Sequence, residues 1–297
     1  MSFSVLPQSR GTRLVTLSPS QFAAARDFCQ AHGPDGVMAG ARIAQAAKAA
    51  VPFGEVWALE RRDNRHRLNP LQTRDLEAVA WAGGNLIPVG ADARAAQAFA
   101  SLARSRGARY ASIVGQAEAV RAIWDSLAPS WPQPRSVRRN QPCMELTGPA
   151  LTQPDPLVRP ATSDMLEQLV PACRAMFTEE LGFPPPGPEA GYRAHVAAQV
   201  ERGNILARTD PGSGEVIFKA ELGSECGPWV QVQGVWTNPA WRGRGVAQAG
   251  MSATVAEARR RDLTRVCLYV NDFNFPAIAV YRKVGFQPVG AWATVMF

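Results

Sequence analysis

Residues 235–247 read Val235-Trp-Thr-Asn-Pro-Ala-Trp-Arg-Gly-Arg-Gly-Val-Ala247. An apolar strand runs into a proline turn, then into a loop with Gly243 and Gly245, and then into a long helix. Glycine lets the backbone turn tightly and approach a ligand closely. The loop N–H groups and the positive end of the helix dipole converge on one point, which predicts an anion site suited to a pyrophosphate. Arg242 and Arg244 add positive charge at its rim.

On its own, a glycine-containing turn before a helix is a weak signal, because an ordinary tight strand–helix connection has the same composition. The stretch is not a Walker A loop, since the Lys-Ser/Thr ending is absent. It is not the GxGxxG fingerprint of dinucleotide sites either, because Gly250 lies too far from Gly245. A second motif is therefore needed to identify the ligand.

That second motif follows the strand expected at residues 265–270. It reads Asn271-Asp-Phe-Asn-Phe-Pro-Ala-Ile-Ala-Val-Tyr-Arg-Lys-Val-Gly-Phe286. The residues that define its spacing are Asn274, Ala277, Tyr281, Gly285 and Phe286.

This spacing matches the second signature of the GNAT superfamily of N-acetyltransferases. The loop Arg242–Ala247 similarly resembles the first signature, (Arg/Gln)-x-x-Gly-x-(Gly/Ala). The two occur in the right order, with one helix and one strand between them. Residues 157–297 therefore resemble a GNAT domain, and the resemblance implies acetyl-CoA (coenzyme A) as the cofactor, with its pyrophosphate on the loop.

Length and element order predict two domains. A chain of 297 residues exceeds the usual size of one domain. Both halves read strand, two helices, strands, helix, strand, helix and strand, although their residues do not repeat. We expect an α/β (α+β) fold of two GNAT-like domains, each with a mixed, mostly antiparallel central sheet flanked by helices. The proline-rich stretch 148–156 is the expected linker, which places the domains at 1–150 and 151–297.

The N-terminal half resembles a GNAT domain only in the order of its elements. Its counterpart of the phosphate loop reads Asn85-Leu-Ile-Pro-Val-Gly-Ala-Asp92, without paired glycines or an arginine. Pro88 also removes a backbone donor. We therefore expect a degenerate half that binds no acyl-CoA and mainly scaffolds the other half. In the C-terminal half, we expect two strands to close the chain up to Phe297.

The resemblance also implies direct attack of an amine on the thioester carbonyl. A strand bulge would donate a backbone N–H to that carbonyl from Val235 or Trp236, with Thr237 as the less favoured alternative. Tyr281 matches the tyrosine that protonates the leaving thiolate, the alternative being a core aromatic residue. Asn274 is expected to contact the pantetheine arm, to cap its helix, or both. The expected cofactor contacts are Val235, Trp236, Thr237, Arg242, Gly243, Arg244, Gly245, Val246, Ala247, Asn274, Ala277 and Tyr281.

The general base and the acceptor site stay open to several interpretations. Glu221 and Glu225 flank the central strands, and Glu221 is our candidate catalytic base, with Gln231 or Gln233 orienting a water as the alternative. The pair Glu179-Glu180 lies where GNAT proteins place their acceptor-binding loop, so Glu179 and Glu180 are candidate substrate-binding residues for a cationic amine. The alternative for this pair is a charged helix end before a proline-rich stop.

The composition also argues against several other classes of protein. The net charge is +7, but the arginines are scattered and form no basic tail, so nucleic-acid binding is disfavoured. The 5 cysteines form no CxxC pair and the 3 histidines are dispersed, which argues against a disulfide framework and a metal site. Residues 1–13 hold no apolar leader, and no stretch is long enough to span a bilayer. We expect a cytoplasmic protein with no membrane partner.

Two functions stay open on the sequence. One is an active enzyme that acetylates a small amine, an amino acid or a protein amine. The other is a module that senses acyl-CoA without turnover. Tyr281 and Asn274 favour the enzyme, because a sensor needs no proton donor.

Overall fold

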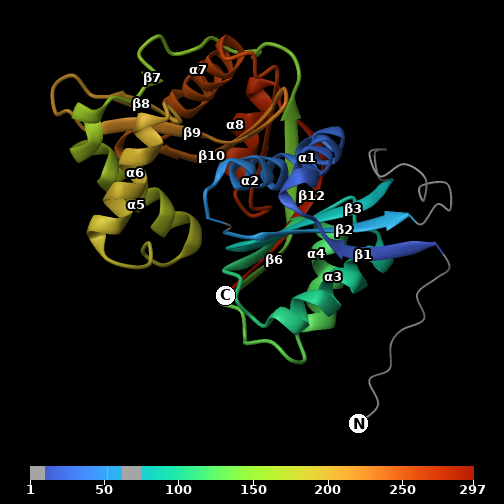
Figure 1. Cartoon of the computed structure of the whole chain (residues 1–297). Helices are drawn as coiled ribbons and strands as arrows, with labels where there is room; N and C mark the ends of the chain where they lie inside the picture. Colours follow the sequence, from blue (N-terminus) through green and yellow to red (C-terminus); the bar gives the residue numbers. More distant parts are fainter. Residues whose placement is uncertain (1–10, 52, 62–74) are drawn as a thin grey trace. The chain divides into compact units, whose positions relative to one another are not determined.

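The computed structural model describes residues 11–51, 53–61 and 75–297. The chain forms two compact units, the first from Met1–Pro142 with Gly290–Phe297 and the second from Cys143–Val289. Each has its own hydrophobic core. The predicted fold class is confirmed, because each unit has a mixed, mostly antiparallel sheet flanked by helices (Figure 1). Residues 1–10, part of the stretch searched for a leader, lie outside the described residues.

The first unit orders its strands β1-β2-β3-β4-β5-β12-β6. β4 and β5 run parallel, whereas β1 to β4 are antiparallel to one another and β12 is antiparallel to β5. Its strands are β1 (Thr12–Thr16), β2 (Glu55–Arg61), β3 (Leu76–Ala82), β4 (Asn85–Val89), β5 (Ser112–Gln116), β6 (Ser136–Leu146, as far as Pro142) and β12 (Gln287–Met296, from Gly290). Its helices are α1 (Phe22–Ala31), α2 (Val37–Lys48), α3 (Ala93–Arg106) and α4 (Ala117–Leu127).

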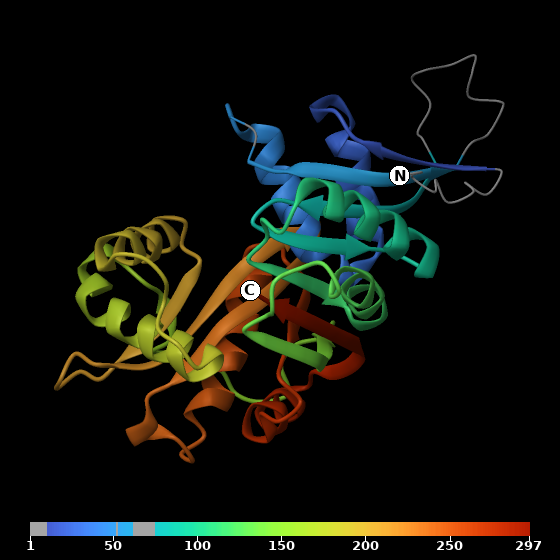
Figure 2. The ribbon, with the colours of Figure 1, turned by 90° about the horizontal axis from the view of Figure 1, so that it is seen from below.

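Alternation along the strands sends apolar side chains to both faces of this sheet. Trp57 and Leu59 of β2 join one core cluster with α3 and α4. Val56 and Ala58 are buried on the opposite face, which α1 and α2 cover (Figures 1 and 2). Two buried faces explain why these strands are nearly continuous in apolar residues.

The second unit orders its strands β6-β11-β10-β9-β8-β7, starting from the end of β6. β10 and β11 are parallel, and the other pairs are antiparallel. Its strands are β7 (Arg159–Pro160), β8 (Ile205–Thr209), β9 (Val216–Cys226), β10 (Trp229–Thr237) and β11 (Arg265–Tyr269). Its helices are α5 (Leu166–Leu181), α6 (Glu189–Glu201), α7 (Val246–Arg260) and α8 (Phe275–Val284).

Here too the two faces of the sheet have separate cores. Ile205 and Ala207 of β8 pack with α5 and α6, whereas Leu206 between them packs with the cluster that holds α7 and α8. Figure 1 shows α5 and α6 on one side of β8–β10 and α7 on the other. The helices that hold candidate site residues, α5 on one face and α7 and α8 on the other, thus pack on the same sheet.

β10 and β11 pair only over a short distance. Their register runs from Trp229 with Arg265 to Gln231 with Cys267. Beyond that point β10 stays paired with β9 alone. The two parallel strands therefore separate toward their carboxyl ends, and this separation makes room for a ligand.

Three features differ from the sequence predictions. A single long strand, β12, replaces the two strands expected at the end of the chain, and from Gly290 it belongs to the first unit, where it pairs with β5. Residues 85–89, interpreted as part of a loop, form β4. The boundary between the units falls inside β6 instead of residues 148–156, so the units differ from the predicted ranges 1–150 and 151–297.

The stretch expected to be a linker is bound to the second unit. The N–H of Leu151 donates to the carbonyl of Val284 at 2.9 Å. Asp155 is buried, and its carboxylate accepts from Arg208 at 2.7 Å. These contacts hold residues 148–156 in place, which the proline content of the stretch did not predict.

All 5 cysteines lie within the described residues, and none forms a disulfide. Among the helices of the described residues, none combines the length and the apolar composition that crossing a membrane requires.

Candidate active site

The loop before α7 leaves the helix end accessible. Gly243 and Gly245 have φ of +75° and +78°, where only glycine avoids strain. Gly245 is the N-cap of α7 and makes no side-chain hydrogen bond to the first turn. Among the described residues, no heavy atom would lie within 4 Å of a Cβ built at either glycine. No side chain at the cap therefore satisfies the first N–H groups of α7, and the space beside the two glycines is open.

The two loop arginines have different surroundings. Arg242 donates from Nε to the carbonyl of Thr237 at 3.0 Å and from Nη2 to Glu179 Oε2 at 2.6 Å. The exposed Arg244 lies over the ring of Trp241, 5.4 Å from its centroid. Both positive charges are at the loop, and Arg242 also connects the loop to α5.

β10 carries a β-bulge at Gly234 and Val235. These two residues lie opposite Ala220 alone, and the register with β9 shifts between Gln233 and Trp236. Gly234 has φ of +58°. A bulge takes backbone groups out of the ladder, so this part of β10 can offer an N–H to a ligand.

A cavity of about 390 Å³ opens beside the bulge. It lies between the separated ends of β10 and β11 and extends to the end of α5 and the start of α8. The predicted site residues on its wall are Glu179, Glu180, Glu221, Val235, Trp236, Asn274 and Tyr281. The structure thus brings together, from four elements, residues up to 102 positions apart (281 − 179).

The other predicted contacts lie beside the cavity, off its wall. Thr237 ends β10, and residues 242–247 connect it through Gly245 to the first turn of α7. Ala277 lies in the first turn of α8, where its N–H donates to Asn274 Oδ1 at 3.3 Å. Asn274 therefore caps its helix, one of the two roles considered for it.

The candidate bases occupy different environments. Glu221 and Gln233 lie on the cavity wall, and Gln233 Nε2 donates to Glu221 Oε2 at 3.3 Å. Glu225 is exposed further along β9, and Gln231 is buried; neither lines the cavity. Of the two strand glutamates, Glu221 thus lies on the cavity wall and Glu225 does not.

Tyr281 is buried on α8 and packs edge-on against Phe286, with ring centroids 6.0 Å apart. Burial raises the pKa of Tyr281, and the negative charge of Glu180 raises it further. The hydroxyl is therefore protonated at neutral pH, the form that a proton donor requires.

The end of α5 forms the opposite wall. Glu179 Oε1 accepts from Trp236 Nε1 at 3.1 Å, and its other oxygen accepts from Arg242. Met176 and Phe177 add apolar surface to the same wall. Glu179 thus joins the wall to β10 and to the loop, while Glu180 lies on the cavity near Tyr281.

One charged residue beside the site was not singled out from the sequence. Lys219 is fully buried, and its Nζ contacts Glu221 Oε1 and lies 3.4 Å from Cys173 Sγ. Burial lowers the pKa of Lys219, but attraction to the Glu221 carboxylate outweighs it and raises the pKa to about 12. Burial raises the pKa of the Cys173 thiol. A lysine in the middle of the apolar run 216–222 was the available signal.

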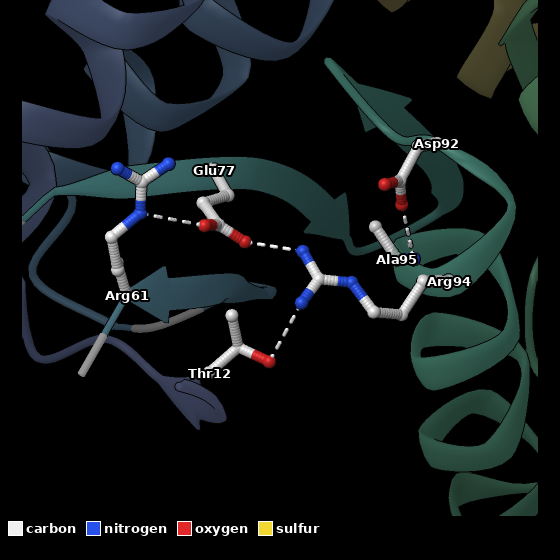
Figure 3. A network of polar contacts seen from close by, with 6 residues as sticks. All are labelled: Thr12, Arg61, Glu77, Asp92, Arg94 and Ala95. Atoms are coloured by element: carbon white, nitrogen blue, oxygen red, sulfur yellow. Dashed lines mark hydrogen bonds and ion pairs between the residues drawn. The ribbon is translucent and has the colours of Figure 1, made fainter. Parts of the chain in front are cut away.

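The corresponding helix end in the first unit is closed. Asp92 caps α3, and its Oδ1 accepts the N–H of Ala95 at 2.8 Å (Figure 3). Arg94 in the first turn contacts Glu77 and donates to Thr12 Oγ1 at 2.9 Å. The N–H of Ala95 and the positive charge of Arg94 are therefore engaged within the unit.

Residues 178–286 match the model of the acetyltransferase (GNAT) family, and residues 54–169 match a domain of unknown function, DUF4081. A mycothiol acetyltransferase from Saccharomonospora viridis is 44% identical over 62 residues. That match spans 21% of this chain and 20% of the relative, so it covers only a fifth of the relative's length.

Several solved structures are similar over almost the whole chain. A GCN5-related N-acetyltransferase from Sphaerobacter thermophilus has a TM-score of 0.58 at 16% identity, covering 95% of this chain and 94% of that one. A GNAT-family acetyltransferase from Colwellia psychrerythraea has a TM-score of 0.54 at 12% identity, covering 96% and 99%. A tandem GNAT protein from the clavulanic acid biosynthesis pathway has a TM-score of 0.54 at 14% identity, covering 95% and 97%. At such identities the likeness establishes the fold alone.

Proposed function

We propose that this chain, which carries a domain of the acetyltransferase (GNAT) family at residues 178–286, is an acetyl-CoA-dependent N-acetyltransferase that modifies a primary amine. One observation carries the proposal: a single cavity holds the β10 bulge, a buried tyrosine and carboxylates, beside an uncapped helix N-terminus. Each of these supplies a group that acyl transfer to nitrogen requires.

The donor would bind along the loop and the bulge. Acetyl-CoA supplies an activated thioester carbonyl. Residues 242–247 would hold its pyrophosphate with the first N–H groups of α7 and the charge of Arg244. Gly245 supports this assignment, because it is the N-cap of α7, has a φ that favours glycine and gives the first turn no side-chain acceptor.

The chemistry follows from the groups on the cavity wall. Glu221 accepts the proton that the attacking amine loses, directly or through a water. The N–H of Val235 or Trp236 donates to the carbonyl oxygen as it gains negative charge. A C–N bond forms and the C–S bond breaks, and the Tyr281 hydroxyl gives its proton to the leaving sulfur.

The acceptor would be an amine on a small molecule, an amino acid or a protein. Glu180 and Glu221 give the cavity negative charge, which attracts a protonated amine. Met176 and Phe177 suit an apolar group beside that amine. The cysteines are all thiols, which fits the reducing cytoplasm as the site of the reaction.

The first unit would serve as a scaffold that binds no acyl-CoA. The Asp92 carboxylate caps the helix end that corresponds to the donor site, and Arg94 is bound to Glu77 and Thr12. An anionic pyrophosphate would meet a carboxylate there, which is unfavourable.

The test joins donor binding with turnover. Calorimetry should show acetyl-CoA binding to the wild-type protein and none to Gly245→Val. The matched control is Gly214→Val in the β8–β9 turn, where φ is +73° and the backbone strain is similar; it should bind as the wild type does. A folded Gly245→Val protein with unchanged affinity contradicts the assignment.

Turnover is then measured as thiol release from acetyl-CoA over a panel of primary amines. Release that depends on the amine supports the enzyme. Tight binding of acetyl-CoA without amine-dependent release across the panel would instead identify an acyl-CoA sensor.

A further inference from the structure

Lys219 and Glu221 form an ion pair in the interior of the second unit. Lys219 is 0% exposed and Glu221 13% exposed. Taking an ammonium out of water is unfavourable unless a well-placed carboxylate compensates it, and apolar residues often serve such a position better. A structural reason is therefore needed for this buried ion pair, and the backbone that the pair contacts supplies it.

The pair lies against the β10 bulge. In the ladder Glu221 is the partner of Gln233, Lys219 is the partner of Trp236, and the bulge falls between these two positions. A Cβ at Gly234 would lie 2.7 Å from Glu221 Oε1 and 3.2 Å from Lys219 Nζ. Glycine is required there because the bulge backbone packs directly on the two charged groups.

The same ammonium also contacts α5. Cys173 belongs to α5, the helix that ends in the acidic pair of the cavity, and its sulfur lies 3.4 Å from Lys219 Nζ. Lys219 is thus in contact with β9, with the bulge of β10 and with α5. No apolar side chain could direct hydrogen bonds to partners on two of these elements at once, whereas an ammonium has three donors.

We infer that Lys219 is a positioning residue of the acyl-transfer site, which fixes the β10 bulge and Glu221 so that the bulge N–H meets the acyl carbonyl. The inference rests on the proposed function. Lys219 touches neither donor nor acceptor; it acts through the backbone of Val235 and Trp236. Its positive charge persists through neutral pH, because its pKa is raised to about 12.

The decisive measurement is the carbon-13 resonance of the carbonyl in protein-bound [1-¹³C]acetyl-CoA, which reports the hydrogen bond to that oxygen without turnover. In the wild type we expect a bound resonance displaced from that of free acetyl-CoA. In Lys219→Met we expect the bound resonance to move most of the way back to the position of free acetyl-CoA. The calorimetric Kd should stay close to the wild-type value, because residues 242–247 are untouched. With an acceptor, kcat should fall about 10²-fold, the effect of a misplacement near 1 Å.

Lys219→Met alone leaves Glu221 without its cation and could fail to fold. The double variant Lys219→Met/Glu221→Met removes both charges, a change that buried pairs tolerate better, and the carbonyl resonance needs no base. The matched control is Glu257→Gln/Arg261→Met, which removes a pair joined at 2.7 Å at the other end of α7, with Glu257 buried. The control should keep the wild-type resonance.

The outcomes separate the two proposals. A bound resonance that returns toward that of free acetyl-CoA in both Lys219 variants, and stays displaced in the control, supports the inference. A wild-type resonance in a folded Lys219 variant overturns it and leaves the proposed function standing. A wild-type protein that binds no acetyl-CoA at all overturns the proposed function, and this inference with it.

Discussion

Helix α7 of the second unit and helix α3 of the first occupy the same place in the order of elements, yet their N-termini are built in opposite ways. α7 follows Gly245, which offers its first turn no side chain. α3 follows Asp92, whose carboxylate accepts the N–H of Ala95 (Figure 3). A helix end needs an acceptor for its first N–H groups. The first unit supplies that acceptor from a side chain, whereas the cap of α7 in the second unit does not.

The last helix of each unit extends the comparison. α8 and α4 begin alike, because Asn274 accepts the N–H of Ala277 and Gln116 accepts the N–H of Ala119. Seven residues after the cap the two diverge: α8 has Tyr281, and α4 has the buried Ile123. The fold has kept the helix and its cap in both units, and only one unit has a hydroxyl at this position.

The largest expected effect tests that difference at Tyr281. Tyr281→Phe keeps the ring and its packing and gives the second unit a non-donating side chain, as in the first. We expect kcat to fall about 10²–10⁴-fold, the contribution of a positioned acid, with an unchanged Kd for acetyl-CoA. Steady-state kinetics, calorimetry and the melting temperature of this variant provide the measurement.

A core role for Tyr281 predicts another result. Losing a buried hydroxyl from a hydrogen bond would lower the free energy of unfolding by about 1 kcal/mol and hardly change the rate. A fall in kcat of less than about threefold, with chemistry shown to be rate-limiting, would mean that the thiolate takes its proton from water.

The second prediction builds the first unit's cap into the second. Gly245→Asp places a carboxylate at the start of α7, where aspartate tolerates a positive φ better than most residues. Affinity for acetyl-CoA should fall about 10²–10³-fold, since charge-assisted hydrogen bonds of about 1.5–3 kcal/mol each are lost. Gly245→Asn is the uncharged control and should lose less. Equal losses in the calorimetric titrations would mean that sterics, and not charge, close the helix end.

The features of this comparison that depend on neighbouring residues could be predicted from the sequence. The loop 242–247 and Tyr281 belong to contiguous motifs, because a turn and one helix face depend on near neighbours. The partner of Arg242 could not be foreseen, since Glu179 is 63 residues away and their contact depends on how α5 packs. The assignment of β12 to the first unit depends likewise on which sheet edge the folded chain presents.

The buried charge was hidden for a similar reason. Lys219 stands in an apolar strand, and the sequence does not reveal whether such a lysine reaches solvent or a carboxylate. The bulge that explains it becomes visible only in the ladder register, where Gly234 and Val235 face one residue.

The third prediction compares the two units in alkali. Burial raises the pKa of Tyr192 to about 12, and it raises the pKa of Tyr281 as well. Burial lowers the pKa of Lys219, but the Glu221 carboxylate outweighs this effect and raises that pKa to about 12. All three groups hold their protons more tightly in the folded chain. Their contribution to stability is therefore complete below pH 10 and is lost as the pH rises from about 10 to 12.

In the first unit, burial also raises the pKa of Tyr110, so one tyrosine there compares with three such groups in the second unit. We expect the second unit to lose stability first, by about 2 kcal/mol for Lys219 alone at 1.36 kcal/mol per pKa unit. Hydrogen exchange resolved by peptide between pH 9 and 12 would measure it. Earlier opening of residues 75–142 would contradict this order.

The smallest effect concerns the cap of the first unit. Asp92→Ala removes the carboxylate that satisfies the first turn of α3, and the free energy of unfolding should fall by about 1 kcal/mol. Asp92→Asn keeps an acceptor at the cap and should lose less.

In both variants acetyl-CoA should bind with one molecule per chain, because Arg94 stays bound to Glu77 and Pro88 still lacks a donor. Denaturant titration measures the first quantity and calorimetric stoichiometry the second. A second equivalent bound by Asp92→Ala would show that one carboxylate is all that separates the two helix ends, and that the first unit has kept the rest of a donor site.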